Sequence, residues 1–304
     1  GTYLLLGGEL SLLVFILFLV VGSRVFDPLT SALTNFTEFR YFSIAGARIL
    51  SLMKEPEMKG ERQSPAAGDI VFEHVSFAYQ DKEVLHDITV TLPKNSLTAL
   101  VGPSGSGKST VMKLCARFYD PQQGHLFFNG VPMDEIAPES LMSHISMVFQ
   151  DVCLFQDTIR NNIRFGKTDA MDEEIIAAAK KACCHDFIMR LPQGYDTMVG
   201  GEKQRISIAR AMLKDAQIIL LDEATASLDP ENEVEIQKAI GTLIKGRTVI
   251  AIAHRLKTIK KADRIIVLDN GQIKEEGTHD ELIRQEGLYS HLWNIQESIS
   301  GWKL

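Results

Sequence analysis

The 304-residue chain contains few cysteines and no excess of positive charge. Its four cysteines, Cys115, Cys153, Cys183 and Cys184, lack metal-ligand spacing, so we interpret them as reduced thiols of a cytosolic domain. The formal net charge of −7 argues against a nucleic-acid partner, because nucleic-acid surfaces normally show a basic face. Internal repeats and low-complexity tracts are absent as well. What remains is a globular chain of one or two domains, whose 45% hydrophobic residues are enough for a core.

The one long apolar run lies near the beginning of the chain. It extends from Leu10 to Gly22, which is shorter than the roughly 20 residues of a bilayer span. A span could continue past Arg24 if that side chain faces a cavity or partner helices. No basic segment precedes the run, which argues against a signal peptide, whereas a buried helix of a soluble protein stays an alternative. The chain begins at Gly1 rather than Met, which indicates a fragment or a processed start.

Beyond Pro28 the pattern becomes amphipathic, as expected of a membrane helix that continues into the cytosol. Residues 54–68 are charged and contain prolines and glycines, so we predict a linker there. From residue 69 on, strand-like and helix-like segments alternate, which predicts an α/β fold with a largely parallel central sheet. The expected strands are 70–77, 84–92, 97–101, 126–128, 218–221, 248–253 and 264–268, and the expected helices are 111–118, 172–191 and 231–244.

The strongest motif follows the predicted strand 97–101 and fits the phosphate-loop pattern G-x-x-x-x-G-K-[ST]. Glycines allow a backbone to turn its N–H groups toward a phosphate, and a helix start adds a favourable dipole. Lys108 is expected to reach the β- and γ-phosphates, and the Ser109 hydroxyl to bind Mg²⁺. A chance glycine-rich turn is the alternative. The motif comprises Gly102, Pro103, Ser104, Gly105, Ser106, Gly107, Lys108, Ser109 and Thr110.

A second motif combines a buried strand with two carboxylates. Ile218 to Leu221 is uniformly apolar, as expected of a strand buried on both faces, and Asp222 and Glu223 follow it directly. Side chains at the end of such a strand emerge at the ligand edge of the sheet. Asp222 would hold Mg²⁺, and Glu223 would activate the attacking water. An acidic pair at a helix start after a core strand is the alternative interpretation.

With these two motifs in this order, the chain resembles the ATP-binding cassette superfamily. It looks most like a transporter of the exporter fold, in which membrane helices and the nucleotide-binding domain share one polypeptide. The resemblance implies a P-loop NTPase domain with a parallel core sheet, an antiparallel β subdomain and a helical subdomain, preceded by a transmembrane-helix remnant. Residues 1–53 would be the end of the transmembrane domain, 54–68 the linker and 69–304 the ATP-binding domain.

Further residues match family motifs, and their roles are implied by the resemblance alone. Tyr79, in Phe77-Ala78-Tyr79, would be the platform for adenine, although strands also favour tyrosine in the core. Gln150 would sense Mg²⁺ and the attacking water in a loop that faces the membrane domain. His254 would contact the γ-phosphate, whereas a lone histidine there would more often be structural. The loop 226–229 would contact the opposite subunit.

One motif departs from the family pattern. The signature is usually Leu-Ser-Gly-Gly-Gln/Glu at a helix start, whereas here Val199 stands in place of the serine before Gly200. That serine caps the helix and donates to the γ-phosphate across the dimer. The segment before Gly200 is missing, together with the acidic loop that normally touches the membrane domain. We interpret this as a deleted or omitted segment, and catalytic impairment of this copy is the alternative.

These residues predict an ATP-binding and ATP-hydrolysing subunit of a membrane transporter, with ATP and Mg²⁺ as cofactors. Its partners would be a second nucleotide-binding domain, identical or different, together with membrane lipid and an unknown transported substrate, and no nucleic acid. The full protein would lie in the inner or plasma membrane with the ATP-binding domain in the cytoplasm. The alternatives are an ATP-binding regulatory half of a heterodimer, and a soluble cassette ATPase of DNA repair or translation.

Overall fold

The computed structural model describes residues 1–55, 57–66, 68–200, 203–222, 230–253 and 256–301. The chain divides into two compact units, Gly1–Glu57 and Met58–Leu304. The boundary between them falls inside the segment 54–68 that the sequence predicts as a linker.

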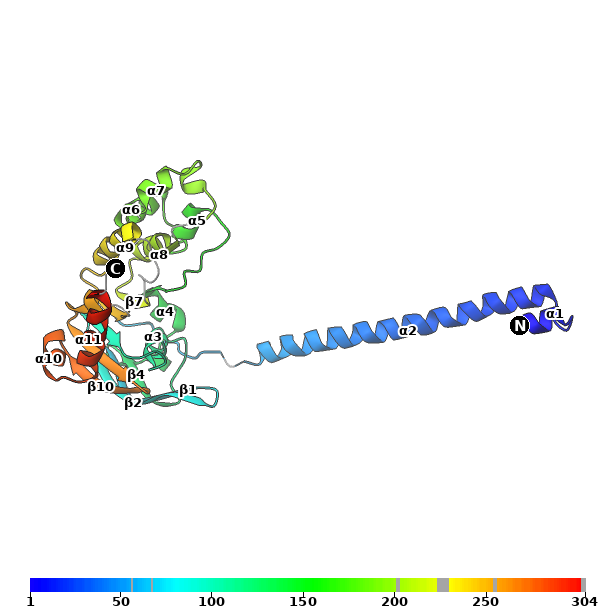
Figure 1. Cartoon of the computed structure of the whole chain (residues 1–304), viewed down its shortest axis with the longest axis horizontal. Helices are drawn as coiled ribbons and strands as arrows, with labels where there is room; N and C mark the ends of the chain where they lie inside the picture. Colours follow the sequence, from blue (N-terminus) through cyan, green and yellow to red (C-terminus); the bar gives the residue numbers. More distant parts are fainter. Residues whose placement is uncertain (56, 67, 201–202, 223–229, 254–255, 302–304) are drawn as a thin grey trace. The chain divides into compact units, whose positions relative to one another are not determined.

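The first unit consists of helix α1 (Thr2–Leu6) and the long helix α2 (Leu12–Met53). The Ser11 hydroxyl accepts a hydrogen bond from the Val14 N–H and so caps the start of α2. The predicted apolar run and its amphipathic continuation form one uninterrupted helix that passes through Pro28 (Figure 1). With 42 residues, α2 is about 63 Å long, about twice the thickness of a bilayer core.

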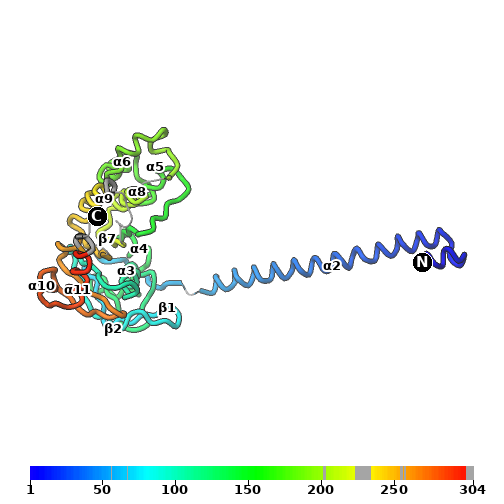
Figure 2. Tube along the Cα trace, in the orientation of Figure 1, coloured from blue at the N-terminus to red at the C-terminus, as the bar shows by residue number. Residues whose placement is uncertain are grey.

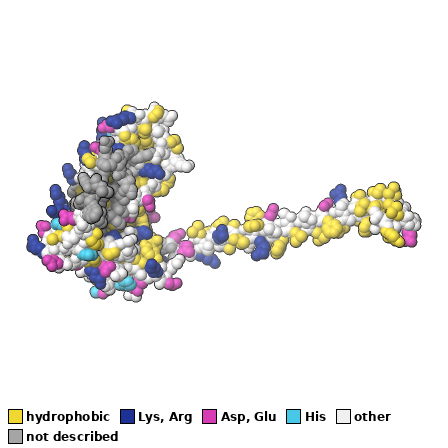
Figure 3. Space-filling view, viewed as in Figure 1, with side chains coloured by type: hydrophobic (Ala, Val, Ile, Leu, Met, Phe, Trp, Pro, Cys, Tyr) yellow, Lys and Arg dark blue, Asp and Glu magenta, His cyan; other side chains and the backbone are white. Residues whose placement is uncertain are grey.

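Apolar side chains cover the N-terminal end of α2 (Figure 3). None of its 42 residues, all of which the structure describes, is buried, and Phe18 is 71% exposed. Its most apolar stretch has a mean hydropathy of 2.1, so α2 is long and apolar enough to cross a membrane.

The second unit is built around a sheet of six strands in the order β10-β9-β3-β8-β7-β6. All strands in it run parallel except β10, which pairs antiparallel with β9. This arrangement confirms the predicted α/β fold with a largely parallel sheet. The strands are β3 (Leu97–Val101), β6 (Ile145–Val148), β7 (Ile218–Asp222), β8 (Thr248–Ile252), β9 (Arg264–Asp269) and β10 (Gln272–Gly277).

A second sheet of four antiparallel strands, in the order β2-β1-β4-β5, forms the β subdomain. Between β4 and β5, Asn129 and Gly130 both have positive φ, 50° and 75°, as a tight hairpin turn requires. The strands are β1 (Ile70–Tyr79), β2 (Lys82–Leu92), β4 (Gln123–Phe128) and β5 (Val131–Pro132). They are followed by the 3₁₀ helix η1 (Met133–Glu135) and by α4 (Pro138–Ser143).

Helix α3 (Lys108–Cys115) lies between the two sheets, and its apolar residues share one core with both. Alternate residues of the central strands explain this layering. Ile218 and Leu220 of β7 belong to the core around α3, whereas Ile219 and Leu221 belong to the core on the opposite face. A parallel strand buried on both faces produces this pattern. The helix sits three residues earlier than the predicted 111–118, because it begins directly at the phosphate loop.

The core on the opposite face joins the sheet to a helical subdomain. Figures 1 and 2 show α5 to α8 gathered at one end of the unit and β1 and β2 at the other. The predicted helix 172–191 is two helices, because Cys183 takes a positive φ of 55° and interrupts it. The helices here are α5 (Ile159–Arg164), α6 (Asp172–Lys181), α7 (His185–Met189), η2 (Gly194–Asp196), α8 (Lys203–Lys214) and α9 (Pro230–Leu243).

A third core lies on the other side of β3 and β9, where the last elements of the chain pack. Tyr289 is its largest fully buried side chain, and its hydroxyl lies 2.9 Å from the His279 ring nitrogen Nδ1. The elements are η3 (Leu256–Ile259), α10 (His279–Arg284) and α11 (Leu288–Gly301).

Candidate functional site

The phosphate loop connects β3 to the first turn of α3. Gly102, Gly105 and Gly107 have φ values of 148°, 79° and 104°, which are conformations that only glycine adopts without strain. The N–H groups of Thr110 and Val111 both donate to the Gly107 carbonyl, so the helix starts on this glycine. The loop therefore ends at a helix N-terminus, which is the arrangement that binds anions.

Lys108 is 6% exposed and its ammonium lies against the loop. Its Nζ donates to the Gly102 carbonyl at 2.9 Å and to the Pro103 carbonyl at 2.7 Å, and it lies 3.4 Å from Ser106 Oγ. The Ser106 carbonyl in turn accepts from the Gly271 N–H at 3.2 Å. These bonds hold a positive charge at the centre of the loop, as recognition of a phosphate requires.

Gly102 tolerates no side chain. A Cβ at this position would lie 2.0 Å from the Leu268 carbonyl oxygen on β9, whereas a Cβ on Gly105 would meet nothing within 4 Å. We expect Gly102→Ala to destabilise the protein by about 2–4 kcal/mol, and Gly105→Ala by only about 1–2 kcal/mol for its positive φ. Urea unfolding of both variants measures this difference. Equal destabilisation would contradict the close approach of the loop to β9.

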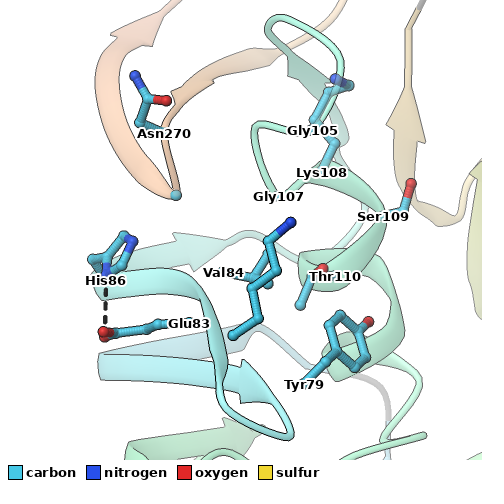
Figure 4. Close-up of a pocket in the computed structure, with 12 residues that line it drawn as sticks. Tyr79, Glu83, Val84, His86, Gly105, Gly107, Lys108, Ser109, Thr110 and Asn270 are labelled. Carbon is cyan, nitrogen blue, oxygen red and sulfur yellow. Dashed lines mark ion pairs between the residues drawn. The ribbon is translucent and has the colours of Figure 1, made fainter.

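A cavity of about 440 Å³ opens beside the loop (Figure 4). Figure 4 shows Tyr79 and Thr110 on one side of it and His86 and Asn270 on the other. The predicted adenine platform, Tyr79, is thus in the same cavity as the loop, and strand β1 carries it there. The residues that line the cavity are Tyr79, Lys82, Glu83, Val84, His86, Gly105, Gly107, Lys108, Ser109, Thr110, Asn270 and Gly271.

The ring of Tyr79 is held by two aromatic neighbours and a cation. Phe77 and Tyr119 both lie edge-on to it at centroid distances of 4.8 and 5.3 Å, and the Lys113 ammonium lies 5.5 Å from the ring centre. The Tyr79 hydroxyl is buried and has no hydrogen-bond partner among the described residues. The hydroxyl is therefore unimportant for holding this side chain, which is positioned through its ring.

Asp222 and the phosphate loop emerge at the same edge of the central sheet. Ile252 of β8 pairs with Asp222 on one side and with Leu100 of β3 on the other. Two strand spacings, about 10 Å, thus separate the backbone of Asp222 from the strand that enters the loop. On the far side of β7, Val148 pairs with Leu221, so Gln150 follows β6 at this edge too and is exposed.

The donor set at this edge fits a magnesium ion. Ser109 offers an exposed hydroxyl from the first turn of α3, Asp222 a carboxylate and Gln150 an amide oxygen. Mg²⁺ prefers such hard oxygen ligands and usually takes only one or two from the protein, with phosphate and water completing its shell. Glu223, His254 and the loop 226–229 lie outside the described residues.

Sequence reasoning missed the far wall of the cavity. Gly271 has a φ of 73°, and a Cβ there would lie 2.3 Å from the Val84 carbonyl, so the turn after β9 presses against β2. His86 on β2 donates its backbone N–H to the Gly271 carbonyl, and its ring pairs with Glu83 at 3.1 Å. The dipeptide Asn270-Gly271 is a turn signal that could have marked this wall.

The departure from the signature pattern lies in an ordered segment. Thr158 and Met198 form an antiparallel bridge, and the Val199 N–H donates to the Asp157 carbonyl at 3.2 Å. The side chain of Val199 packs against the apolar core of the helical subdomain. Helix α8 is described from Lys203 on. Val199 thus takes part in a strand-like pairing and has a packing role in the helical subdomain.

Comparison with known proteins agrees with this architecture. The family model described as "ABC transporter" matches residues 85–226, which contain the phosphate loop and Asp222. The solved structure of a bacterial Atm1-family ABC exporter with ATP bound is 39% identical, with a TM-score of 0.77 over 90% of this chain and 50% of that chain. Residues 85–226 of this chain are therefore assigned to the ABC transporter family. The similarity to this solved exporter and to the curated relatives supports an exporter-type ABC transporter.

The curated relatives include two bacterial proteins. The ATP-dependent lipid A-core flippase of Idiomarina loihiensis is 45% identical over 96% of this chain and 53% of the relative. The putative multidrug export ATP-binding/permease protein YgaD of Bacillus subtilis is 41% identical over 97% of this chain and 53% of the relative. The chain spans about half the length of the curated relatives it matches.

One alignment also contains positions that this chain does not fill. The match to the lipid A-core flippase of Legionella pneumophila runs over 239 positions with 49% identity, but it covers only 76% of this 304-residue chain and 41% of the relative. The aligned length therefore exceeds the number of residues that this chain contributes. This relative carries residues within the matched span that the present chain lacks.

Proposed function

We propose that the second unit binds and hydrolyses MgATP as the motor of a membrane exporter to which α2 contributes a membrane helix. The observation that carries this proposal is the shared sheet edge at which the phosphate loop, Asp222 and the strand before Gln150 meet, beside a cavity that contains Tyr79. Family membership supplies the expectation of ATP as the ligand.

The candidate site residues have distinct parts in this proposal. Lys108 and the loop N–H groups bind the β- and γ-phosphates, and the ring of Tyr79 stacks on adenine. Ser109, Gln150 and Asp222 hold Mg²⁺, which neutralises charge on the transferred phosphoryl group. Glu223 orients the attacking water as general base and His254 contacts the γ-phosphate, both on the strength of the sequence pattern. Catalysis is then mainly positioning and charge stabilisation.

A second surface of this unit is suited to contact with the membrane helices. Beside β6 lies an apolar cavity of about 300 Å³ whose wall includes Phe149 and the stacked pair Phe155 and Phe165, with ring centres 4.2 Å apart. These three side chains are 43–52% exposed. Burial lowers the pKa of Arg210 and of Lys214, which line the same cavity. We propose that the cytosolic ends of membrane helices dock here.

The transporter would act as a dimer in the inner or plasma membrane, with this unit in the cytoplasm. In this proposal two such units close head to tail, so that each ATP lies between one phosphate loop and the other subunit's signature helix. Closure and reopening would move the membrane helices and carry the substrate across. Lipid A-core and multidrug export are functions that the names of the relatives give to those proteins, and a cargo of that amphipathic kind is a proposal here.

Nucleotide binding can be tested at Tyr79, the proposed platform for adenine. We expect the full chain in detergent to bind a fluorescent ATP analogue with Mg²⁺ saturably, and Tyr79→Ala to weaken that binding about tenfold, because loss of one stacked base costs about 1–3 kcal/mol. Tyr79→Phe is the matched control. It keeps the ring and removes a hydroxyl that has no partner among the described residues, so its affinity is expected to equal that of the wild type. Failure of the wild type to bind would refute the proposed function.

A further inference from the structure

A short segment of the second unit, which follows α2 in the chain, is held to the rest of that unit by polar contacts. This strap comprises residues 59–64. The N–H groups of Glu61 and Arg62 both donate to the Glu135 carbonyl, at 3.1 and 2.9 Å, and the Arg62 carbonyl accepts from the Ala137 N–H at 2.8 Å. The Ser64 N–H donates to the Ser140 hydroxyl at 2.8 Å. All of these partners lie in or beside η1 and α4.

One buried arginine ties the strap to the end of α3. Arg117 is 4% exposed, and its Nη2 donates to the Lys59 carbonyl at 2.6 Å. The same guanidinium donates to the carbonyls of Asp134 and Ile136 and pairs with Asp120 at 2.9 Å. Arg117 therefore joins the strap, the chain around η1 and the residues after α3 through a single planar group.

The backbone at Arg117 has a conformation that favours glycine. The Arg117 N–H donates to the Leu114 carbonyl and the Phe118 N–H to the Lys113 carbonyl, which is the Schellman ending of a helix. Its φ is 51°, at the position where glycine is normally found. An arginine there costs about 1–2 kcal/mol of left-handed strain that glycine would avoid.

Two connections lead from Arg117 to the nucleotide cavity. The first is α3, which has Lys108 at one end and Arg117 two residues beyond the other, and which is buried between two sheets. The second runs through Tyr119, whose ring contacts that of Tyr79 at 5.3 Å and which lines a cavity of about 250 Å³ together with Arg117. A ligand that fixes both the first turn of α3 and the ring of Tyr79 also restricts Arg117.

We propose that docking of the strap on Arg117 is thermodynamically linked to nucleotide binding, with Arg117 as the positioning residue. This inference rests on the proposed function, because it takes MgATP as the ligand of the cavity. The strap has two states, docked and released, and it is held by polar contacts at largely exposed residues, as a locally opening segment is. Bound nucleotide favours the docked state, and by reciprocity the docked strap raises nucleotide affinity. The chain that leads to α2 thereby responds to the nucleotide.

Hydrogen exchange of the full chain in detergent, with and without MgATPγS, tests the linkage. In the wild type we expect nucleotide to slow exchange of the amides of Glu61, Arg62 and Ala137 about fivefold or more, a typical size for coupled sites. In Arg117→Gly this slowing disappears and the affinity for MgATPγS falls by the same factor. Glycine suits the positive φ of the helix ending, so this variant removes the guanidinium without damaging α3. Arg117→Lys restores only part of the effect, because an ammonium lacks the planar fork.

Two further variants separate linkage from misfolding. Gly60 has a φ of 136°, and a Cβ there would lie 2.2 Å from the Ile136 carbonyl, so Gly60→Ala displaces the strap and leaves Arg117 in place. It should reproduce the loss of affinity seen in Arg117→Gly. Arg62→Ala removes an exposed ion pair with Glu135 and should change neither quantity. If Arg117→Gly or Gly60→Ala releases the strap but leaves the nucleotide affinity unchanged, the inference is overturned. If the wild type does not bind nucleotide at all, the proposed function is refuted instead.

Discussion

Replacing Lys108 by methionine is expected to weaken MgATP binding about 100- to 1,000-fold and to abolish hydrolysis. The ammonium is the one lysine charge held inside the described part of the loop, by the Gly102 and Pro103 carbonyls. Charge-assisted bonds to phosphate are the strongest polar contacts available to the site, and removal of one preorganised donor typically costs about 100- to 1,000-fold in rate. Methionine keeps the apolar stem and leaves no large void.

The measurement is a titration with a fluorescent ATP analogue, alongside phosphate release at saturating ATP. Lys113→Ala is the matched control, because Lys113 lies on the same helix but points at Tyr79 rather than into the loop. We expect it to change affinity by less than about fivefold, since a cation–π contact of this kind contributes about 0.5–1 kcal/mol. Thermal unfolding shows whether both variants keep the fold. Similar affinities for both variants would refute the assignment of Lys108.

The sequence allowed prediction of those parts of the site that are local in the chain. The phosphate loop, the strand before Asp222 and the turn at Asn129-Gly130 each depend on a few adjacent residues, and the structure has them at the expected places. The helix after the loop begins at Lys108 rather than at residue 111, because the positive φ of Gly107 lets the first turn form directly on the loop. The helical pattern of 172–191 did not reveal the break at Cys183, whose φ is 55°.

The sequence does not reveal which distant segments of the chain lie together. The proximity of Asp222 to the loop depends on β8 lying between β3 and β7, although 147 residues separate Val101 from Thr248 in the numbering. The composition of residues 54–68 predicts a linker, and nothing in it reveals that Lys59 is bound to Arg117 and that residues 61–64 are bound in and beside η1 and α4. The far wall of the cavity, at Gly271 and His86, likewise forms from segments distant in sequence.

Restoring the serine of the signature is expected to raise ATP hydrolysis about 100-fold. We would insert Leu-Ser between Val199 and Gly200, which gives the family pattern before Gly200 and leaves the pairing of Val199 with Asp157 intact. A helix cap contributes about 1 kcal/mol, and a hydrogen bond to the γ-phosphate about 1.5–3 kcal/mol. Insertion of Leu-Ala is the matched control, because it has the same length and lacks only the hydroxyl. Equal rates for the two insertions would show that the missing serine does not limit this chain.

The same insertion also tests whether the site is shared between two subunits. In a mixed dimer, a Lys108→Met chain cannot bind ATP, but its signature helix would face the ATP of the wild-type chain. We therefore expect an equimolar mixture to hydrolyse ATP at the raised rate only when the Leu-Ser insertion is on the Lys108→Met chain. When the mutant chain lacks the insertion, the mixture should hydrolyse no faster than wild type alone. If the rate rises only when the insertion and Lys108 are in the same chain, each unit instead completes its own site.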